Sequence, residues 1–187
     1  MTFARLAMGY LGIDQSLRAT GICRLADDGR AVATATVGTT GLTDGPRLLF
    51  IQRAIAAQLD GVTFAALEGY SYHSINQPFK LGEIGGVVKV LLCERAIPYV
   101  VVPPILVKMY ATGRATAKKR DMLKAASLDG FTTRDDNQAD AFFLAQIARA
   151  YALDNATHRC QLDVIHTLRH PTPPAARAPR RRVRAAF

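Results

Sequence analysis

Cysteine is scarce in this sequence of 187 residues, and it has no long apolar run. Its three cysteines, Cys23, Cys93 and Cys160, form no Cys-x-x-Cys pair, so we expect neither a disulfide framework nor a zinc site. No window approaches the roughly 18 uninterrupted apolar residues of a membrane span. The first nine residues lack the charged start, apolar middle and cleavage site of a secretion signal. These absences predict a protein of a reducing, cytoplasmic compartment with no membrane partner.

Acidic residues are few beside the basic ones. The chain has 15 Asp and Glu against 24 Lys and Arg, a net charge of +9, and such an excess favours a polyanionic partner. Residues 170–187, "HPTPPAARAPRRRVRAAF", hold five arginines and no acid. We expect a domain at residues 1–169, followed by a structureless tail that contacts phosphates through arginines such as Arg180, Arg181 and Arg182. A tail that only adds solubility is the alternative.

Hydrophobic periodicity predicts an α/β fold. Residues 8–13, 20–25 and 31–37 are short β-rich runs joined by turns, typical of antiparallel strands. Two more strands are expected at residues 62–68 and 97–103, each after an amphipathic helix, at residues 45–59 and 80–96. Further helices are expected at residues 104–110, 116–128 and 135–153. The expected sheet is mixed, with three antiparallel strands followed by parallel ones and helices on its faces.

Three acids stand at related places in this order. Asp14 ends the first strand and Glu68 the fourth, and Asp140 lies in the first turns of the last helix. If the two strands are parallel neighbours, all three carboxylates meet at one edge. Oxygen ligands suit Mg²⁺ or Mn²⁺, and two such ions can hold the attacking water and the leaving oxygen of a phosphodiester. Each acid alone also fits a turn, a strand end or a helix start, but three together in a basic chain favour a metal site.

Four segments in this order resemble RuvC-type Holliday-junction resolvases, within the ribonuclease H-like and retroviral-integrase fold. They are "GIDQSLRATGICRL", "ALEGYSYHSINQPFKLGEIGGVV", "VPPILVKMYATGRATAKKRDM" and "DDNQADAFFLAQIA". The resemblance implies a ribonuclease H-like five-stranded sheet and a homodimer that binds a four-way DNA junction. It implies paired symmetric nicks made with two Mg²⁺ or Mn²⁺ ions per site and no small-molecule cofactor. A bacterial or phage origin is expected.

The same resemblance implies roles for individual residues. The metal carboxylates would be Asp14, Glu68 and Asp140. Lys108 and Lys118 match the family's basic positions near the scissile phosphate.

The chain departs from the family pattern at one metal position. The family usually has Asp or His three residues before the last acid, where this chain has Asn137, which offers only a neutral carbonyl oxygen. Asp136 shares the helix face of Asp140 nearly as well, so Asp136 and Asn137 are both candidates for the fourth ligand. Alternatively, Asp135 or Asp136 only caps the helix.

The polar loop after Glu68 contains interleaved aromatics, a composition suited to stacking on unpaired bases. Candidate DNA contacts there and in the basic segment are Tyr70, Tyr72, Phe79, Lys80, Arg114, Lys118 and Lys119. For Phe79, a lid on the core fits equally well, and the basic segment also fits a solvated face. Gly82 and Gly86 share one helix face, which indicates close approach of another helix, either within the chain or from a second subunit.

The predicted activity is therefore that of a crossover junction endodeoxyribonuclease. A less selective nuclease for flaps, forks or RNA–DNA hybrids would use the same residues. A junction-binding protein with weak or no catalysis is a third reading, which Asn137 favours. An actin-like or sugar-kinase ATPase would need two such domains and Gly-rich phosphate loops, for which the sequence has neither the length nor the residues.

Overall fold

The structure is a computed structural model that describes residues 9–69 and 78–171. Three consecutive strands open this part of the chain, and helices and strands alternate after them. The elements are β1 (Gly9–Asp14), β2 (Ala19–Leu25), β3 (Ala31–Gly38), α1 (Asp44–Ala56), β4 (Val62–Glu68), α2 (Pro78–Glu94), β5 (Tyr99–Val102), α3 (Pro104–Thr112), α4 (Lys119–Leu128), α5 (Asp136–Leu153) and α6 (Arg159–Arg169).

The strands form one mixed sheet in the order β3-β2-β1-β4-β5. β1 pairs antiparallel with β2, and β2 with β3, because short turns join them. β1 pairs parallel with β4, and β4 with β5, because each connection includes a helix. The predicted fold class, a five-stranded mixed sheet flanked by helices, is confirmed.

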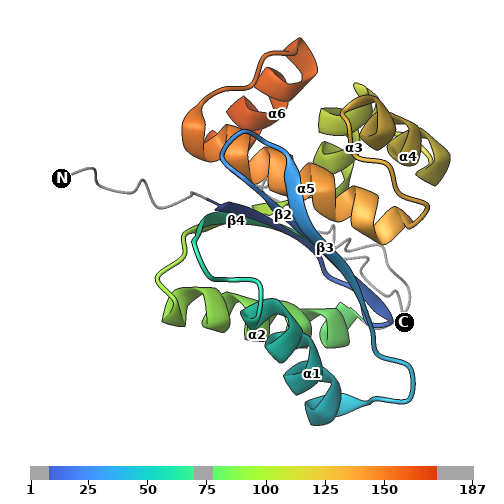
Figure 1. The fold of residues 1–187 in the computed structure, drawn as a ribbon, viewed down its shortest axis with the longest axis vertical. Helices are drawn as coiled ribbons and strands as arrows, with labels where there is room; N and C mark the ends of the chain where they lie inside the picture. Colours follow the sequence, from blue (N-terminus) through green and yellow to red (C-terminus); the bar gives the residue numbers. More distant parts are fainter. Residues whose placement is uncertain (1–8, 70–77, 172–187) are drawn as a thin grey trace, which may run out of the picture.

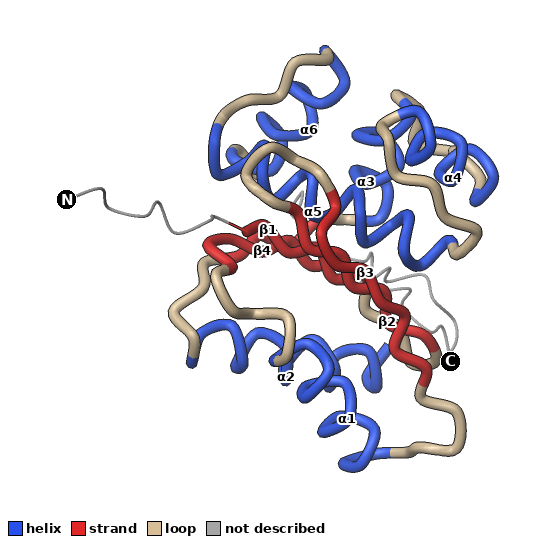
Figure 2. Tube along the Cα trace, viewed as in Figure 1, coloured by secondary structure: helices blue, strands red, loops and turns tan. Residues whose placement is uncertain are grey.

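Helices cover both faces of the sheet. α1 and α2 pack on one face, and α3, α4, α5 and α6 lie on the other (Figures 1 and 2). Successive side chains of a strand point to opposite faces, so Leu11 and Ile13 of β1 enter the core beneath α1 and α2. Tyr10 enters the second core, which α5 dominates with Phe142 and Phe143. β1 is buried on both faces, which makes it the centre of the fold.

Two glycines let α5 rest directly on the sheet. A Cβ at Gly12 of β1 would lie 2.0 Å from the carbonyl oxygen of Ala141. A Cβ at Gly21 of β2 would lie 2.1 Å from the carbonyl oxygen of Asn137. Any side chain at either position would therefore push the helix away. The first two turns of α5 are held over the carboxyl end of β1 by this contact.

Two elements differ from the sequence-based prediction. Helix α6 was not predicted, although Val164, Ile165 and Leu168 have helical spacing, and the first two are buried in the core. α4 begins at Lys119 rather than at residue 116, with Lys118 as its N-cap. Among the described residues, no helix is long and apolar enough to cross a bilayer.

Candidate active site

The two strand-end acids lie side by side. The parallel register pairs Ile13 of β1 with Leu67 of β4, and both strands end one residue later, at Asp14 and Glu68. Both acids extend the side-chain alternation that faces α5. Asp14 is only 7% exposed although it ends its strand. The predicted parallel neighbours are confirmed, and they bring two carboxyl groups to one buried place.

α5 adds the third acid. Its main chain lies against Gly12 and Gly21, so its first turns cross the sheet at the end of β1. The pKa of Asp140 is raised to about 7, first by burial and then by the negative charges of Asp14 and Asp136. A carboxyl group feels such repulsion only when other acids are close to it. The three acids predicted from the sequence therefore form one electrostatic cluster.

Asp14 and Glu68 are the most tightly coupled members of this cluster. Burial raises the pKa of Asp14 well above its ordinary value, and the neighbouring Glu68 raises it further. The pKa of Glu68 is also raised by burial, while a side-chain hydrogen bond from Asp14 and the charge of Lys108 act against the rise. Both carboxyl groups are therefore harder to ionise than a solvent-exposed acid. The cluster is electrostatically costly when every member is ionised, and a bound cation would remove that cost.

The donor set fits a hard divalent cation. The clustered side chains offer only carboxylate oxygens, the ligands that Mg²⁺ and Mn²⁺ prefer. Among the described residues, the Oε1 atom of the buried Gln15 has no hydrogen-bond partner. In residues 9–69 and 78–171, no three acidic, histidine or cysteine side chains are arranged as a complete metal-ligand set. The pKa values of Asp14 and Glu68 are both raised, so an ion must compete with protons to bind them.

The first turn of α5 separates the candidates for the fourth ligand. Asp135 is the N-cap, and its Oδ1 accepts hydrogen bonds from the backbone N and the Nδ2 of Asn137, both at 2.9 Å. Thr36 of β3 donates to Asp135 Oδ2 at 2.5 Å. The capping role suggested for Asp135 or Asp136 therefore belongs to Asp135. The cap uses Asn137 Nδ2 and not its Oδ1, and the charge of Asp136 acts on Asp14 and Asp140, so both residues stay candidates for the fourth ligand.

Two lysines bring positive charge to the acids. Lys119 forms an ion pair with Asp136, and hydrogen bonding to Asp136 raises its pKa, with smaller contributions from Asp140 and Asp14. Lys108 and Lys119 both lower the pKa of Asp140 against the effect of burial. Lys118, which the resemblance singled out, is an exposed N-cap, and its charge is not among those that act on Asp140. The residue facing the cluster from the start of α4 is Lys119.

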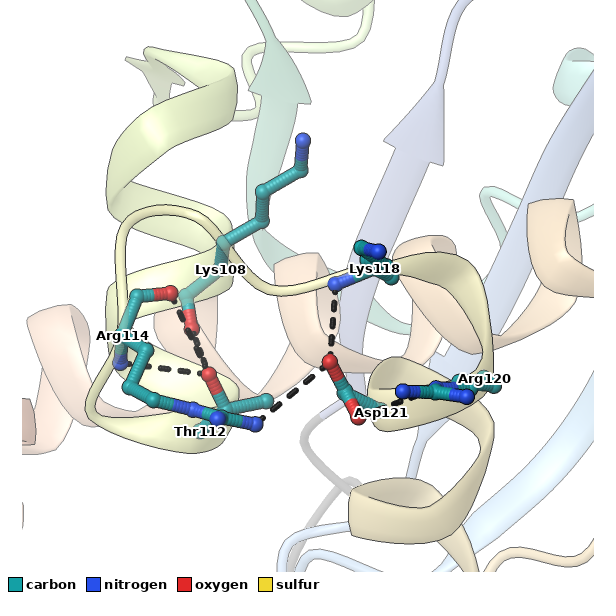
Figure 3. A network of polar contacts seen from close by, with 6 residues as sticks. All are labelled: Lys108, Thr112, Arg114, Lys118, Arg120 and Asp121. Atoms are coloured by element: carbon teal, nitrogen blue, oxygen red, sulfur yellow. Dashed lines mark hydrogen bonds and ion pairs between the residues drawn. The ribbon is translucent and has the colours of Figure 1, made fainter.

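The remaining basic residues of this segment surround one acid, Asp121 (Figure 3). Asp121 accepts a hydrogen bond from the backbone N of Lys118 at 3.0 Å, and its carboxylate lies 3.4 Å from Arg114 Nη2. Arg120 approaches it at 3.9 Å. The side chain of Lys108 points away from this network (Figure 3). Arg114 thus has an internal partner, although its side chain remains 64% exposed.

Some predicted DNA contacts lie outside the described residues: Tyr70, Tyr72, Arg180, Arg181 and Arg182. Phe79 and Lys80 lie in the first turn of α2. Phe79 is 86% exposed, so its predicted alternative as a lid on the core is wrong. Lys80 is half-buried.

The glycines of α2 do not pack against another element among the described residues. A Cβ at Gly82 or at Gly86 would meet no other atom within 4 Å there. No helix in residues 9–69 and 78–171 therefore approaches α2 closely at these glycines. Close approach of a helix from a second subunit remains a prediction.

Two residues near the cluster escaped the sequence-based prediction. Gln15 directly follows Asp14, and its Nε2 donates to the carbonyl oxygen of Glu68 at 2.5 Å. Thr36 holds the cap of α5 from 99 residues away. The position of Gln15 beside a predicted ligand was a usable signal. Nothing in the sequence links Thr36 to Asp135, because only the antiparallel pairing brings β3 to the start of α5.

The fold is that of known RuvC structures. The chain superposes on the Thermus thermophilus RuvC structure with a TM-score of 0.66 and 22% identity, over 80% of this chain and 99% of that one. It matches T. thermophilus RuvC in complex with a Holliday junction substrate with a TM-score of 0.63, again at 22% identity, over 79% of this chain and 94% of that one. No family model matches the sequence. No curated protein matches it either.

Proposed function

We propose that this protein is a metal-dependent DNA endonuclease that resolves four-way junctions by paired symmetric nicks. The observation that carries the proposal is the buried cluster of Asp14, Glu68 and Asp140, whose carboxyl groups repel one another at the carboxyl end of two parallel strands. The fold shared with a RuvC that was solved with a Holliday junction supports this substrate. The net charge of +9 supports a nucleic-acid partner.

Asp14, Glu68 and Asp140 would hold the ions, with Asp136 as the fourth ligand. Bound Mg²⁺ or Mn²⁺ supplies an ionised water and neutralises the leaving oxygen of the phosphodiester. The protein's own part is to hold these carboxylates in place for the ions. Rigidity serves that part well, because β1 and β4 are paired up to Ile13 and Leu67, one residue before the acids, and α5 cannot move closer to the sheet.

Lys108 and Lys119 would neutralise the phosphate. Both act on Asp140 through their charge, and they reach the cluster from α3 and α4. Ammonium groups placed where negative charge develops lower the barrier to phosphodiester cleavage. Arg114 and Lys118 lie on the same basic segment and would contact the flanking DNA backbone.

Symmetric nicking of two strands requires two active sites, and we propose a homodimer. α2 presents an apolar face made of Phe79, Gly82, Gly86 and Val90, spaced three or four residues apart. Phe79 is 86% and Val90 55% exposed. The open space beside both glycines would let the same helix of a second copy approach closely.

The proposal is tested with Asp14→Asn on a synthetic four-way junction in Mg²⁺. We expect the variant to bind the junction as the wild-type protein does and to lose cleavage by at least about 1,000-fold, because Asn brings no negative charge to the ions. Undiminished cutting would refute the assignment. Cleavage of forks, flaps or RNA–DNA hybrids at the junction rate would indicate a less selective nuclease. Tight junction binding without cleavage in any Mg²⁺ or Mn²⁺ concentration would indicate a binding protein.

A further inference from the structure

Gln15 joins the two strands that carry the acids. It follows Asp14, the last residue of β1, and only 7% of it is exposed. Its Nε2 donates to the carbonyl oxygen of Glu68, the last residue of β4, at 2.5 Å. The two residues are 53 positions apart in the chain. A side chain thus continues the link between β1 and β4 at the point where their backbone ladder ends.

The main chain around Glu68 is held from both sides. On the β5 side, the backbone N of Gly69 donates to the carbonyl oxygen of Val102 at 2.8 Å. On the β1 side, the ladder ends at Ile13 and Leu67, and among the described residues the next contact comes from Gln15. Removing the Gln15 amide would free one side of the segment that presents the Glu68 carboxylate.

The other end of the same amide is unusual. Oε1 of Gln15 is buried and has no hydrogen-bond partner among the described residues. A buried acceptor without a partner is unfavourable, so such atoms are rare in folded proteins. Oε1 is bonded to the same carbon as Nε2 and therefore lies near the main chain at the end of β4. An apolar side chain of similar length would avoid the cost, so the amide needs another explanation.

We propose that Gln15 is a positioning residue of the acidic cluster. Its amide nitrogen holds the main chain of Glu68 and so fixes the spacing of the two strand-end acids that would bind the divalent ion. This inference rests on the proposed metal-dependent function. It explains why a hydrogen-bond donor occupies a buried place directly after a metal carboxylate.

The role matters because one ion would bind both carboxylates only if their backbones keep their spacing. The pairing of β1 and β4 ends at Ile13 and Leu67, one residue before the two acids. The Gln15 link holds the spacing over this last residue. Groups that orient metal ligands in this way typically contribute 10–100-fold to metal affinity.

The test is Mn²⁺ binding by the full chain, measured by isothermal titration calorimetry at pH 8. Gln15→Met keeps the length of the side chain and removes the hydrogen bond to the Glu68 carbonyl oxygen. We expect it to weaken Mn²⁺ binding by about tenfold or more. The matched control is Gln146→Met. Gln146 lies on α5, away from the ends of β1 and β4, and its Nε2 also donates to a distant carbonyl oxygen, that of Gly29, at 3.0 Å. The control should bind Mn²⁺ as the wild-type protein does.

Each outcome has one meaning. If the wild type and Gln146→Met bind Mn²⁺ and Gln15→Met binds it equally well, the role of Gln15 is refuted and the proposed function stands. If the wild type binds no Mn²⁺, the metal-dependent function fails and the role of Gln15 fails with it. If Gln15→Met does not fold, Gln15→Asn replaces it, since the shorter amide stays polar but does not reach the Glu68 carbonyl oxygen. Wild-type affinity in Gln15→Asn would equally refute the role.

Discussion

At the scale of single residues, the site is built from side chains that would be unfavourable without a cation. Asp140 illustrates this most clearly, because burial first and then Asp14 and Asp136 raise its pKa from 3.8 to about 7. Lys119 offsets part of the repulsion through its ion pair with Asp136. A protein selected only for stability would not place these acids together. Their cost indicates that the cluster serves chemistry.

This cost predicts how stability depends on pH. The folded chain binds the Asp140 proton more tightly than the unfolded chain, so the protonated form stabilises the fold at low pH. That stability is lost as the pH rises from about 4 to about 7. In EDTA at pH 8, Asp140→Asn should therefore stabilise the protein by roughly 2 kcal/mol, given about 1.4 kcal/mol per pKa unit and some relaxation.

Thermal unfolding in EDTA at pH 4 and pH 8 checks this expectation. The Tm of Asp140→Asn should exceed that of the wild type at pH 8 and match it at pH 4. Asp163→Asn is the control, because Asp163 is exposed on α6. Equal Tm values for Asp140→Asn and the wild type at pH 8 would show that Asp140 is not strained by its neighbours.

At the scale of elements, the position of α5 relative to the sheet decides whether the acids meet. Gly12 and Gly21 allow contact between the helix backbone and the strands. The hydrogen bond from Thr36 to the N-cap Asp135 holds the start of the helix from the edge strand β3. These three contacts place Asp140 over the end of β1 without any direct bond to its carboxylate.

Gly12→Ala tests the close approach. Its methyl group would lie 2.0 Å from the Ala141 carbonyl oxygen, and relieving that overlap requires α5 to move. We expect a loss of at least about 3 kcal/mol in the free energy of unfolding, at the upper end of overpacking costs. Urea unfolding measures it. Gly38→Ala is the control, because a Cβ there meets nothing within 4 Å, and equal stability of the two variants would contradict the packing role.

At the scale of the whole molecule, the basic segment and the proposed dimer face lie on opposite helical layers. The layer of α3 to α6 carries the basic segment, and Lys108 of α3 acts through its charge on Asp140 (Figure 1). The layer of α1 and α2 exposes Leu49, Phe50 and Val90, and the other layer also exposes apolar side chains such as Ile105 and Leu128. We propose that the basic layer contacts DNA and that α2 contacts a second subunit, which would let two active sites act on one junction.

Val90→Glu tests the dimer. A charged side chain on the apolar face of α2 would have no partner in the interface and should convert dimers to monomers at micromolar concentration. Sedimentation velocity measures the shift, and retained Mn²⁺ binding would show that each subunit is still folded. Leu128→Glu is the control, since Leu128 is 78% exposed on the opposite helical layer. A wild-type protein that is monomeric at all concentrations would contradict the proposed interface.

Local sequence patterns predicted the five strands, five of the six helices among the described residues and the three acids, because periodicity and strand ends are patterns that burial imposes on a chain. They also led to Asp136 as a candidate, but not to a choice between Asp136 and Asn137. The tertiary structure adds that Asp135 is the cap, that Lys119 forms an ion pair with Asp136, and that Gln15 spans β1 and β4. The physical reason is that these facts are contacts between segments far apart in the chain, and the direction of a side chain depends on how helices and strands pack together.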